Sequence, residues 1–195
     1  MAGRNPNAAF QQFIDPLRSA LNCVTQERLT ASRQHTYEVG TIYSVLLNDL
    51  NPVRLRTAAG ILPVYMSVGQ QVRIIKTEEP ADPRGPYKIQ IVEYFYDLRS
   101  DDHTELLTFH WTPEAEGDGV VTFPHLHAGS AIIAQDAPIR PRDFHKIHIP
   151  TGRVSVEAII RLAITEFGAI PLKRNWVDEL NRTEAAFLNW RTRIS

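Results

Sequence analysis

The segment "YKIQIVEYFYDL", residues 87–98, decides the fold class of this protein. Tyr, Ile, Val and Phe dominate it, and these residue types favour extended strands because aromatic and β-branched side chains pack well on a pleated surface. The segment therefore predicts a long β-strand, and the neighbouring elements can be worked out from it in both directions.

Further strands are expected on both sides of this segment, joined to it by loops. A loop with three prolines at 79–86 precedes it, and the turn "RSDDHT" follows it. The other expected strands are 71–79, 105–111 and 120–127, with a shorter one at 144–149. Because these loops are too short for crossover helices, consecutive strands must be antiparallel. Residues 71–128 are thus predicted to form an antiparallel meander of at least four strands.

Two helix starts are recognisable near the N-terminus. Asn5-Pro6 and Asp15-Pro16 each place an N-cap residue before a proline. Proline is tolerated at the first helical position, where its missing N–H would have no partner in any case. The pattern predicts two helices, at about 6–14 and at about 16–30.

The C-terminal part of the chain is predicted to hold two more helices. Ser155 is suited to cap the first of them, which ends near Gly168, and Asn175 is suited to cap the second. Apolar or small residues then recur at alternating steps of four and three, which is the spacing of one helix face. This stripe consists of Trp176, Leu180, Thr183, Phe187, Trp190 and Ile194. It predicts burial against the sheet or self-association through a second subunit.

These elements together predict an α+β protein with one domain, residues 1–195. Residues 1–34 would be an N-terminal helical segment, 71–150 the β-meander core and 151–195 the C-terminal helical pair. Residues 35–70 include "YEVGTIYSVLLNDL", whose β-branched and aromatic residues favour a strand.

Composition limits the classes of function that need to be considered. With 43% hydrophobic and 22% charged residues the chain has an ordinary globular composition, and its net charge of −1 lacks the positive excess of proteins held to nucleic acid mainly by phosphate contacts. Cys23 is the only cysteine, so no internal disulfide can form, and its apolar neighbours predict burial. No apolar run approaches the length of a membrane span, and no secretory signal is recognised. A cytoplasmic location is expected.

The segment "FPHLH", residues 123–127, carries the main functional hypothesis. His125 and His127 are two positions apart on an expected strand, so their side chains should project to the same side. Pairing Phe109 with Phe123 would place Glu105 opposite His127, at the end of the apolar face. In this register His110 would lie on the other face, but a slip of one residue would bring it to the histidines.

Two kinds of chemistry fit these side chains. His125, His127 and Glu105 could ligate Zn²⁺ or a similar ion, or they could form an acid/base group that works near neutral pH. A second histidine pair, His145 and His148, could fold back toward the first. Nearby, Arg140 and Arg142 are candidate phosphate contacts. A solvated or hydrogen-bonded strand end would account for the same histidines without any function.

Residues 93–127 resemble the sheet of the TumE-like toxin family of bacterial toxin–antitoxin systems. The resemblance rests on Glu105-Leu106-Leu107 and on Thr122-Phe123-Pro124-His125 with His127. Where that family has Arg-Tyr-Asp after the leucines, this chain has Thr108-Phe109-His110. The resemblance implies a similar sheet and an RNA-directed or partner-bound role.

Two functional hypotheses from different classes follow. In the first, a small cytoplasmic bacterial protein acts on RNA or another phosphodiester through the histidine cluster, with or without a divalent metal. In the second, a non-catalytic binding or assembly protein uses its terminal helices as the interface, and the histidines are structural.

Overall fold

The computed structural model describes residues 2–32, 36–77, 84–100, 104–117, 120–129 and 147–188. Its strands are β1 (Ala2–Gly3), β2 (Leu29–Ala31), β3 (Ile42–Leu47), β4 (Val53–Arg54), β5 (Tyr65–Lys76), β6 (Tyr87–Arg99), β7 (Glu105–Trp111), β8 (His125–Ala128) and β9 (Ile149–Pro150). The helices are α1 (Pro6–Leu21), α3 (Val156–Thr165) and α4 (Trp176–Leu188), with a short 3₁₀ turn η1 (Asn48–Leu50).

The described strands form one antiparallel sheet in the order β2-β3-β5-β6-β7-β8-β9, with β1 paired to β6 and β4 to β5. The long strand β6 lies at its centre, between β5 and β7. The predicted α+β class, with an antiparallel meander and helices at both ends of the chain, is confirmed.

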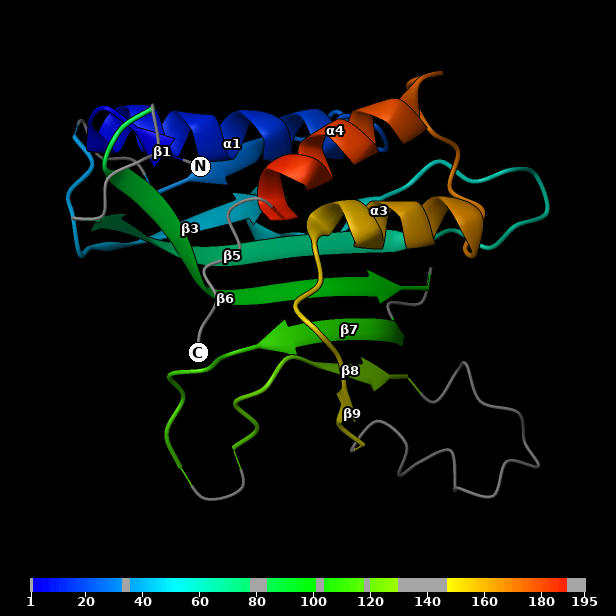
Figure 1. The fold of residues 1–195 in the computed structure, drawn as a ribbon. Coiled ribbons are helices and arrows are strands. Elements are labelled where there is room, and N and C mark those ends of the chain that lie inside the picture. Colours follow the sequence, from blue (N-terminus) through cyan, green and yellow to red (C-terminus); the bar gives the residue numbers. More distant parts are fainter. Residues whose placement is uncertain are drawn as a thin grey trace.

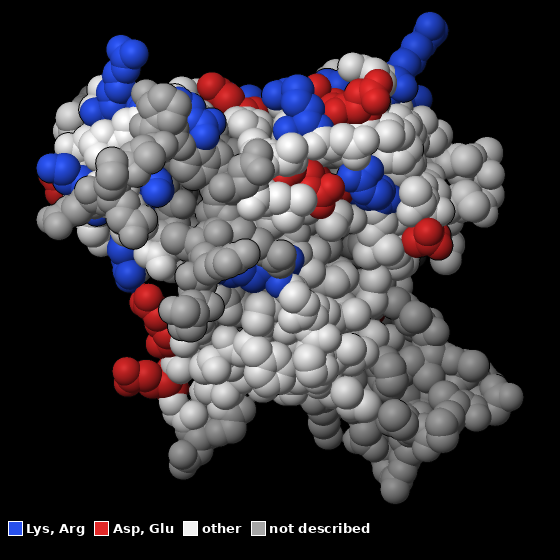
Figure 2. Space-filling view, in the orientation of Figure 1, with Lys and Arg blue, Asp and Glu red and all other residues white. Residues whose placement is uncertain are grey.

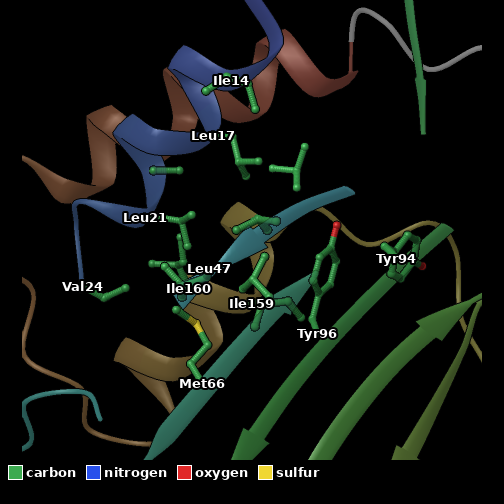
Figure 3. Close-up of a cluster of buried hydrophobic side chains, with 14 of the residues drawn as sticks. Ile14, Leu17, Leu21, Val24, Leu47, Met66, Tyr94, Tyr96, Ile159 and Ile160 are labelled. Atoms are coloured by element: carbon green, nitrogen blue, oxygen red, sulfur yellow. The ribbon is translucent and has the colours of Figure 1, made fainter. Parts of the chain in front are cut away.

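The three helices lie on one side of the molecule (Figure 1). They gather beside β3, β5 and β6, whereas β7, β8 and β9 extend beyond them. Side chains such as Leu21 of α1 and Ile160 of α3 point toward Leu47 and Met66 of the sheet (Figure 3). Burial of this apolar surface supplies the main stabilising contribution to the fold. β8 and β9 therefore lie farthest from the helices, whereas β7 still joins the core through Trp111.

The first helix differs from the prediction of two helices. Asn5 caps α1 as expected, because its side-chain oxygen accepts a hydrogen bond of 2.8 Å from the amide of Ala8. The helix then continues through Pro16 to Leu21. An internal proline removes one backbone hydrogen bond. The continuous buried stripe that includes Phe13 and Leu17 offsets this loss.

Several strand boundaries differ from those expected. The strand expected at 71–79 begins earlier, as β5 at Tyr65. The strand expected at 120–127 begins only at His125, because Pro124 has no N–H to donate to a ladder. Residues 35–70 contain β3, as the sequence favoured.

The C-terminal helices follow the predicted caps and stripe in part. The hydroxyl of Ser155 accepts a hydrogen bond of 3.0 Å from the amide of Ala158 and so caps α3. On α4, Leu180 and Thr183 are fully buried, and the helix packs mainly against α1 and α3. Trp190 and Ile194 lie outside the described residues.

Charge is distributed unevenly over the surface seen in Figure 2. Lys, Arg, Asp and Glu side chains gather over the helices, and the described surface below them is mostly uncharged. Cys23 is buried, as expected. Within the described ranges, no helix has the length and apolar character needed to cross a membrane.

Glu157 of the helical layer makes the stability of the fold depend on pH. This side chain of α3 is 4% exposed, and burial raises its pKa above the usual range for a carboxyl group. The folded state therefore holds this proton to higher pH than the unfolded state. Its contribution to the free energy of unfolding consequently falls as pH rises from the unfolded pKa through the folded one.

We expect Glu157→Gln to raise the free energy of unfolding at pH 8, because the amide keeps the hydrogen-bonding shape without the buried charge. The gain should shrink as pH falls toward about 4.3, the ordinary pKa of a glutamate. Urea unfolding at several pH values measures this. A gain that does not change with pH would contradict the assignment.

Candidate functional site

The pairing of β7 with β8 differs from the predicted register. The structure pairs His110 with His125 and Thr108 with His127. Phe123, which was expected opposite Phe109, precedes β8 and is 45% exposed. The predicted register is therefore wrong by an odd number of residues. Its physical cause is the later start of β8, which makes the loop after β7 longer than assumed.

An odd shift moves the histidines to the other face of the sheet. Phe109 and Trp111 belong to the face that packs under the helices, where Phe109 pairs with Leu126. Because side chains alternate along a strand, His110, His125 and His127 face away from the helices. The expectation that His125 and His127 share a face is confirmed, and the expectation that this face is the apolar one is wrong.

Four histidines meet on this face, which is here called the histidine face. Ring centroids are 5.3 Å apart between His110 and His125, 4.8 Å between His125 and His127, and 4.6 Å between His127 and His148. His148 is also 4.9 Å from His125. These four are all of the histidines in the described residues, and they come from β7, β8 and the residue just before β9.

Three of these side chains are arranged so that they could share one metal ion. Ligand nitrogens of His110, His125 and His127 all lie within 4.8 Å of one another. Nitrogens bound tetrahedrally to Zn²⁺ at about 2.0–2.1 Å are about 3.4 Å apart, so small ring rotations would close the site. The exposed His148 lies within reach as a fourth ligand, or its place could be taken by water.

His125 is the best-defined member of the cluster. It is 2% exposed, and its Nδ1 lies 2.8 Å from the carbonyl oxygen of Phe123. A carbonyl only accepts, so Nδ1 carries the hydrogen and donates it, and the lone pair of the neutral ring is on Nε2. A backbone carbonyl that orients a histidine in this way is the usual second partner of a metal-ligating imidazole.

The neutral form is favoured at two of the other histidines. Burial, followed by the neighbouring His125 and His127, lowers the pKa of His110. His148 is exposed but lies against the other rings, and this partial desolvation, followed by the neighbouring His127 and His125, lowers its pKa. A neutral imidazole is the form that ligates metals. At neutral pH these two rings are therefore available as ligands.

The structure does not place Glu105 opposite His127. Glu105 pairs with Arg99 of β6, beyond a register shift at the end of that strand pair, and Thr108 occupies the position opposite His127. The proposed ligand set therefore loses its carboxylate and gains His110. The candidate phosphate contacts Arg140 and Arg142, together with His145, lie outside the described residues.

A buried carboxyl group that the sequence did not reveal lies two strands away from His127, on the histidine face. Asp97 of β6 is fully buried, accepts a hydrogen bond of 2.9 Å from the hydroxyl of Thr108, and is ion-paired with Arg99. Thr108 in turn is the cross-strand neighbour of His127. In the sequence, Asp97 looks like the polar end of a strand, and only the pairing of β6 with β7 shows that it belongs to the histidine face.

An open groove continues from the cluster across the same face. It has a volume of about 440 Å³, and His110 lies at one end of its lining. Leu46, Leu50 and Phe95 supply apolar surface, and Glu93 supplies a carboxyl group. Burial raises the pKa of Glu93 above its usual range. A small molecule in this groove would reach the histidines directly.

Comparisons of the chain with protein-family models, with curated proteins and with solved structures find no match.

Proposed function

We propose that this protein binds a transition metal ion, Zn²⁺ in the first place, through His110, His125 and His127, and that the bound ion serves hydrolysis of a phosphodiester. The observation that carries the proposal is the convergence of three imidazoles from two strands within 4.8 Å, with the central ring held by a carbonyl. Three histidines and one open position are typical of catalytic rather than structural zinc.

The chemistry follows from the charge of the ion. A Zn²⁺ ion held by His110, His125 and His127 would lower the pKa of a coordinated water to about 7 and would polarise a phosphoryl oxygen. His148 would act as a fourth ligand that dissociates when water takes its place. The buried pair Asp97 and Thr108 would hold the strand position beside His127.

RNA is the phosphodiester that we place first, and a cytoplasmic location goes with it. The support comes from the sequence, in the resemblance of residues 93–127 to the TumE-like toxin family. The alternative, a binding or assembly protein with structural histidines, predicts that no metal is bound. An acid/base site formed by His125 and His127 alone would also need no metal, and its activity would follow a bell-shaped pH profile.

The test is the metal content of the purified protein and its variants. We expect one Zn²⁺ per chain by elemental analysis and calorimetric titration, and none in the double variant His125→Ala, His127→Ala. Leu126→Ala is the matched control, because it truncates the residue between them on the opposite face and should keep the metal.

Each proposed function predicts a different outcome. Metal lost from both the double variant and the control would indicate that the strand, not the ligands, had been damaged. A folded wild-type protein that binds no Zn²⁺, Ni²⁺ or Cu²⁺ at micromolar concentration would refute the metal site. Cleavage of a mixed-sequence RNA that disappears on chelation and returns with Zn²⁺ would support hydrolysis.

A further inference from the structure

One cross-strand row connects the histidine face to the groove. The pairings place Leu46 beside Gly69, Gly69 beside Phe95, and Phe95 beside His110. His110 is in turn paired with His125. The row therefore runs from β3 to β8, from apolar residues at one end to proposed metal ligands at the other. A ligand held at the histidines has this row as the floor of its binding site.

Gly69 lets apolar side chains pack directly onto the sheet at one end of this floor. A Cβ atom at this position would lie 3.0 Å from the Cδ2 atom of Leu50, so the side chain of Leu50 arches over the glycine. Leu50 is held there by the turn η1, in which it has a φ of 67°, a conformation that is costly for a residue with a side chain. Next to Gly69 lies the half-buried ring of Phe95, which is edge-on to the ring of His110.

Among the described residues, the polar side of the groove carries carboxyl and amide groups. Gln71 is paired with Glu93, and a register shift in β6 lies directly beside this pair. Bulges of this kind often re-aim a side chain near a binding site. Among the described residues that line the groove there is no Lys or Arg. Arg73, two residues beyond Gln71, is ion-paired with Glu114 at 3.2 Å.

The charges indicate which part of a ligand would lie in the groove and which part at the histidines. A phosphate would be repelled by Glu93 and would find no positive side chain in the described groove, so an anionic group belongs at the histidines and the metal. The group in the groove has to be uncharged, planar enough to lie on Phe95, and equipped with N–H donors for Glu93. A nucleobase has all three properties. The volume of about 440 Å³ lies within the range of small-molecule sites, about 300–1,000 Å³.

We propose that this groove binds the base of a nucleotide whose phosphate lies at the histidine face, with the base stacked on Phe95 and its amino group donating to Glu93. The inference rests on the proposed function for the position of the phosphate. It identifies the base as the part of the substrate that is recognised. It also predicts a preference for guanine, adenine or cytosine over uracil, which has no exocyclic amino group.

Calorimetric titration of the zinc-loaded protein tests this with 5′-GMP, 5′-AMP, 5′-CMP, 5′-UMP and ribose 5-phosphate. The nucleotides should bind more tightly than ribose 5-phosphate. Phe95→Leu should weaken GMP binding roughly 5- to 150-fold, the range expected for loss of one base–aromatic stack, and should leave the affinities for ribose 5-phosphate and Zn²⁺ unchanged. Phe109→Leu, on the neighbouring strand but the opposite face, is the matched control and should leave GMP binding unchanged.

Two further variants test the base-binding groove at other positions, so that the conclusion does not depend on Phe95→Leu alone. Glu93→Gln should reduce the preference for GMP over UMP, and Leu50→Ala should weaken all four nucleotides without changing their order. Nucleotides that bind no better than ribose 5-phosphate, or a GMP affinity that is the same in Phe95→Leu and wild type, would overturn the proposal.

Guanosine, which has no phosphate, separates the two proposals. If the protein binds no metal but binds guanosine in a manner that depends on Phe95, the groove assignment stands and the metal-dependent function fails. If Zn²⁺ binds and neither guanosine nor GMP depends on Phe95, the metal site stands and the base-binding groove is refuted.

Discussion

Replacing His125 with alanine is expected to weaken Zn²⁺ binding by at least about 100-fold, since loss of a group that merely orients a ligand already costs about 10- to 100-fold. His125 is the buried centre of the cluster, with its ring within 5.3 Å of three other imidazoles. Its hydrogen bond to Phe123 also sets which nitrogen is free. His148→Ala should weaken binding less, because His148 is exposed and water can replace it.

Competition against a chromophoric chelator measures both affinities, and circular dichroism checks that each variant is folded. A larger loss in His148→Ala than in His125→Ala would mean that the ion is centred nearer to β9 than the described ligand set predicts. Equal affinities in wild type and His125→Ala would remove His125 from the ligand set altogether.

Truncation of Ile160 to alanine is expected to lower the free energy of unfolding by roughly 2–5 kcal/mol, the usual range for a buried isoleucine. Ile160 on α3 is fully buried and belongs to the cluster that joins the helices to the sheet (Figure 3). The loss combines the transfer free energy of the removed carbons with the cavity that remains, since surrounding elements relax only in part.

Leu188→Ala is the control for this truncation. Leu188 at the end of α4 is 51% exposed, and such surface substitutions usually change stability by no more than about 0.5 kcal/mol. Urea unfolding of both variants gives the comparison. A loss in Leu188→Ala as large as that in Ile160→Ala would show that the exposed end of α4 is covered in solution, as self-association would require.

Local sequence patterns predicted the class of the fold and much of its layout. The aromatic and β-branched run at 87–98 is sufficient for a strand, and a cap such as Ser155 needs only its own side chain and the amide three residues on. The shared side of His125 and His127 follows from alternation along one strand. Each of these properties depends on residues close together in the chain, so one sequence can reveal them.

Local patterns were misleading where the packing of a whole element outweighed the preference of a single residue. The proline at position 16 reads as a helix start, yet α1 passes through it, because one apolar stripe packs along the whole helix. Similarly, "VVTF" at 120–123 reads as a strand, but the ladder begins after Pro124.

The composition of the candidate site was decided by the tertiary structure. Which face the histidines occupy depends on the register between β7 and β8, and a shift of an odd number of residues exchanges the two faces of a strand. That shift removed Glu105 from the cluster and brought in His110. His148 joined because β9, the next described strand, folds back to pair with β8. The sequence alone determined that two imidazoles point the same way. The number that meet there, and the groove they face, were determined by the register between separate strands, whose free energy is shared among many contacts that no local pattern records.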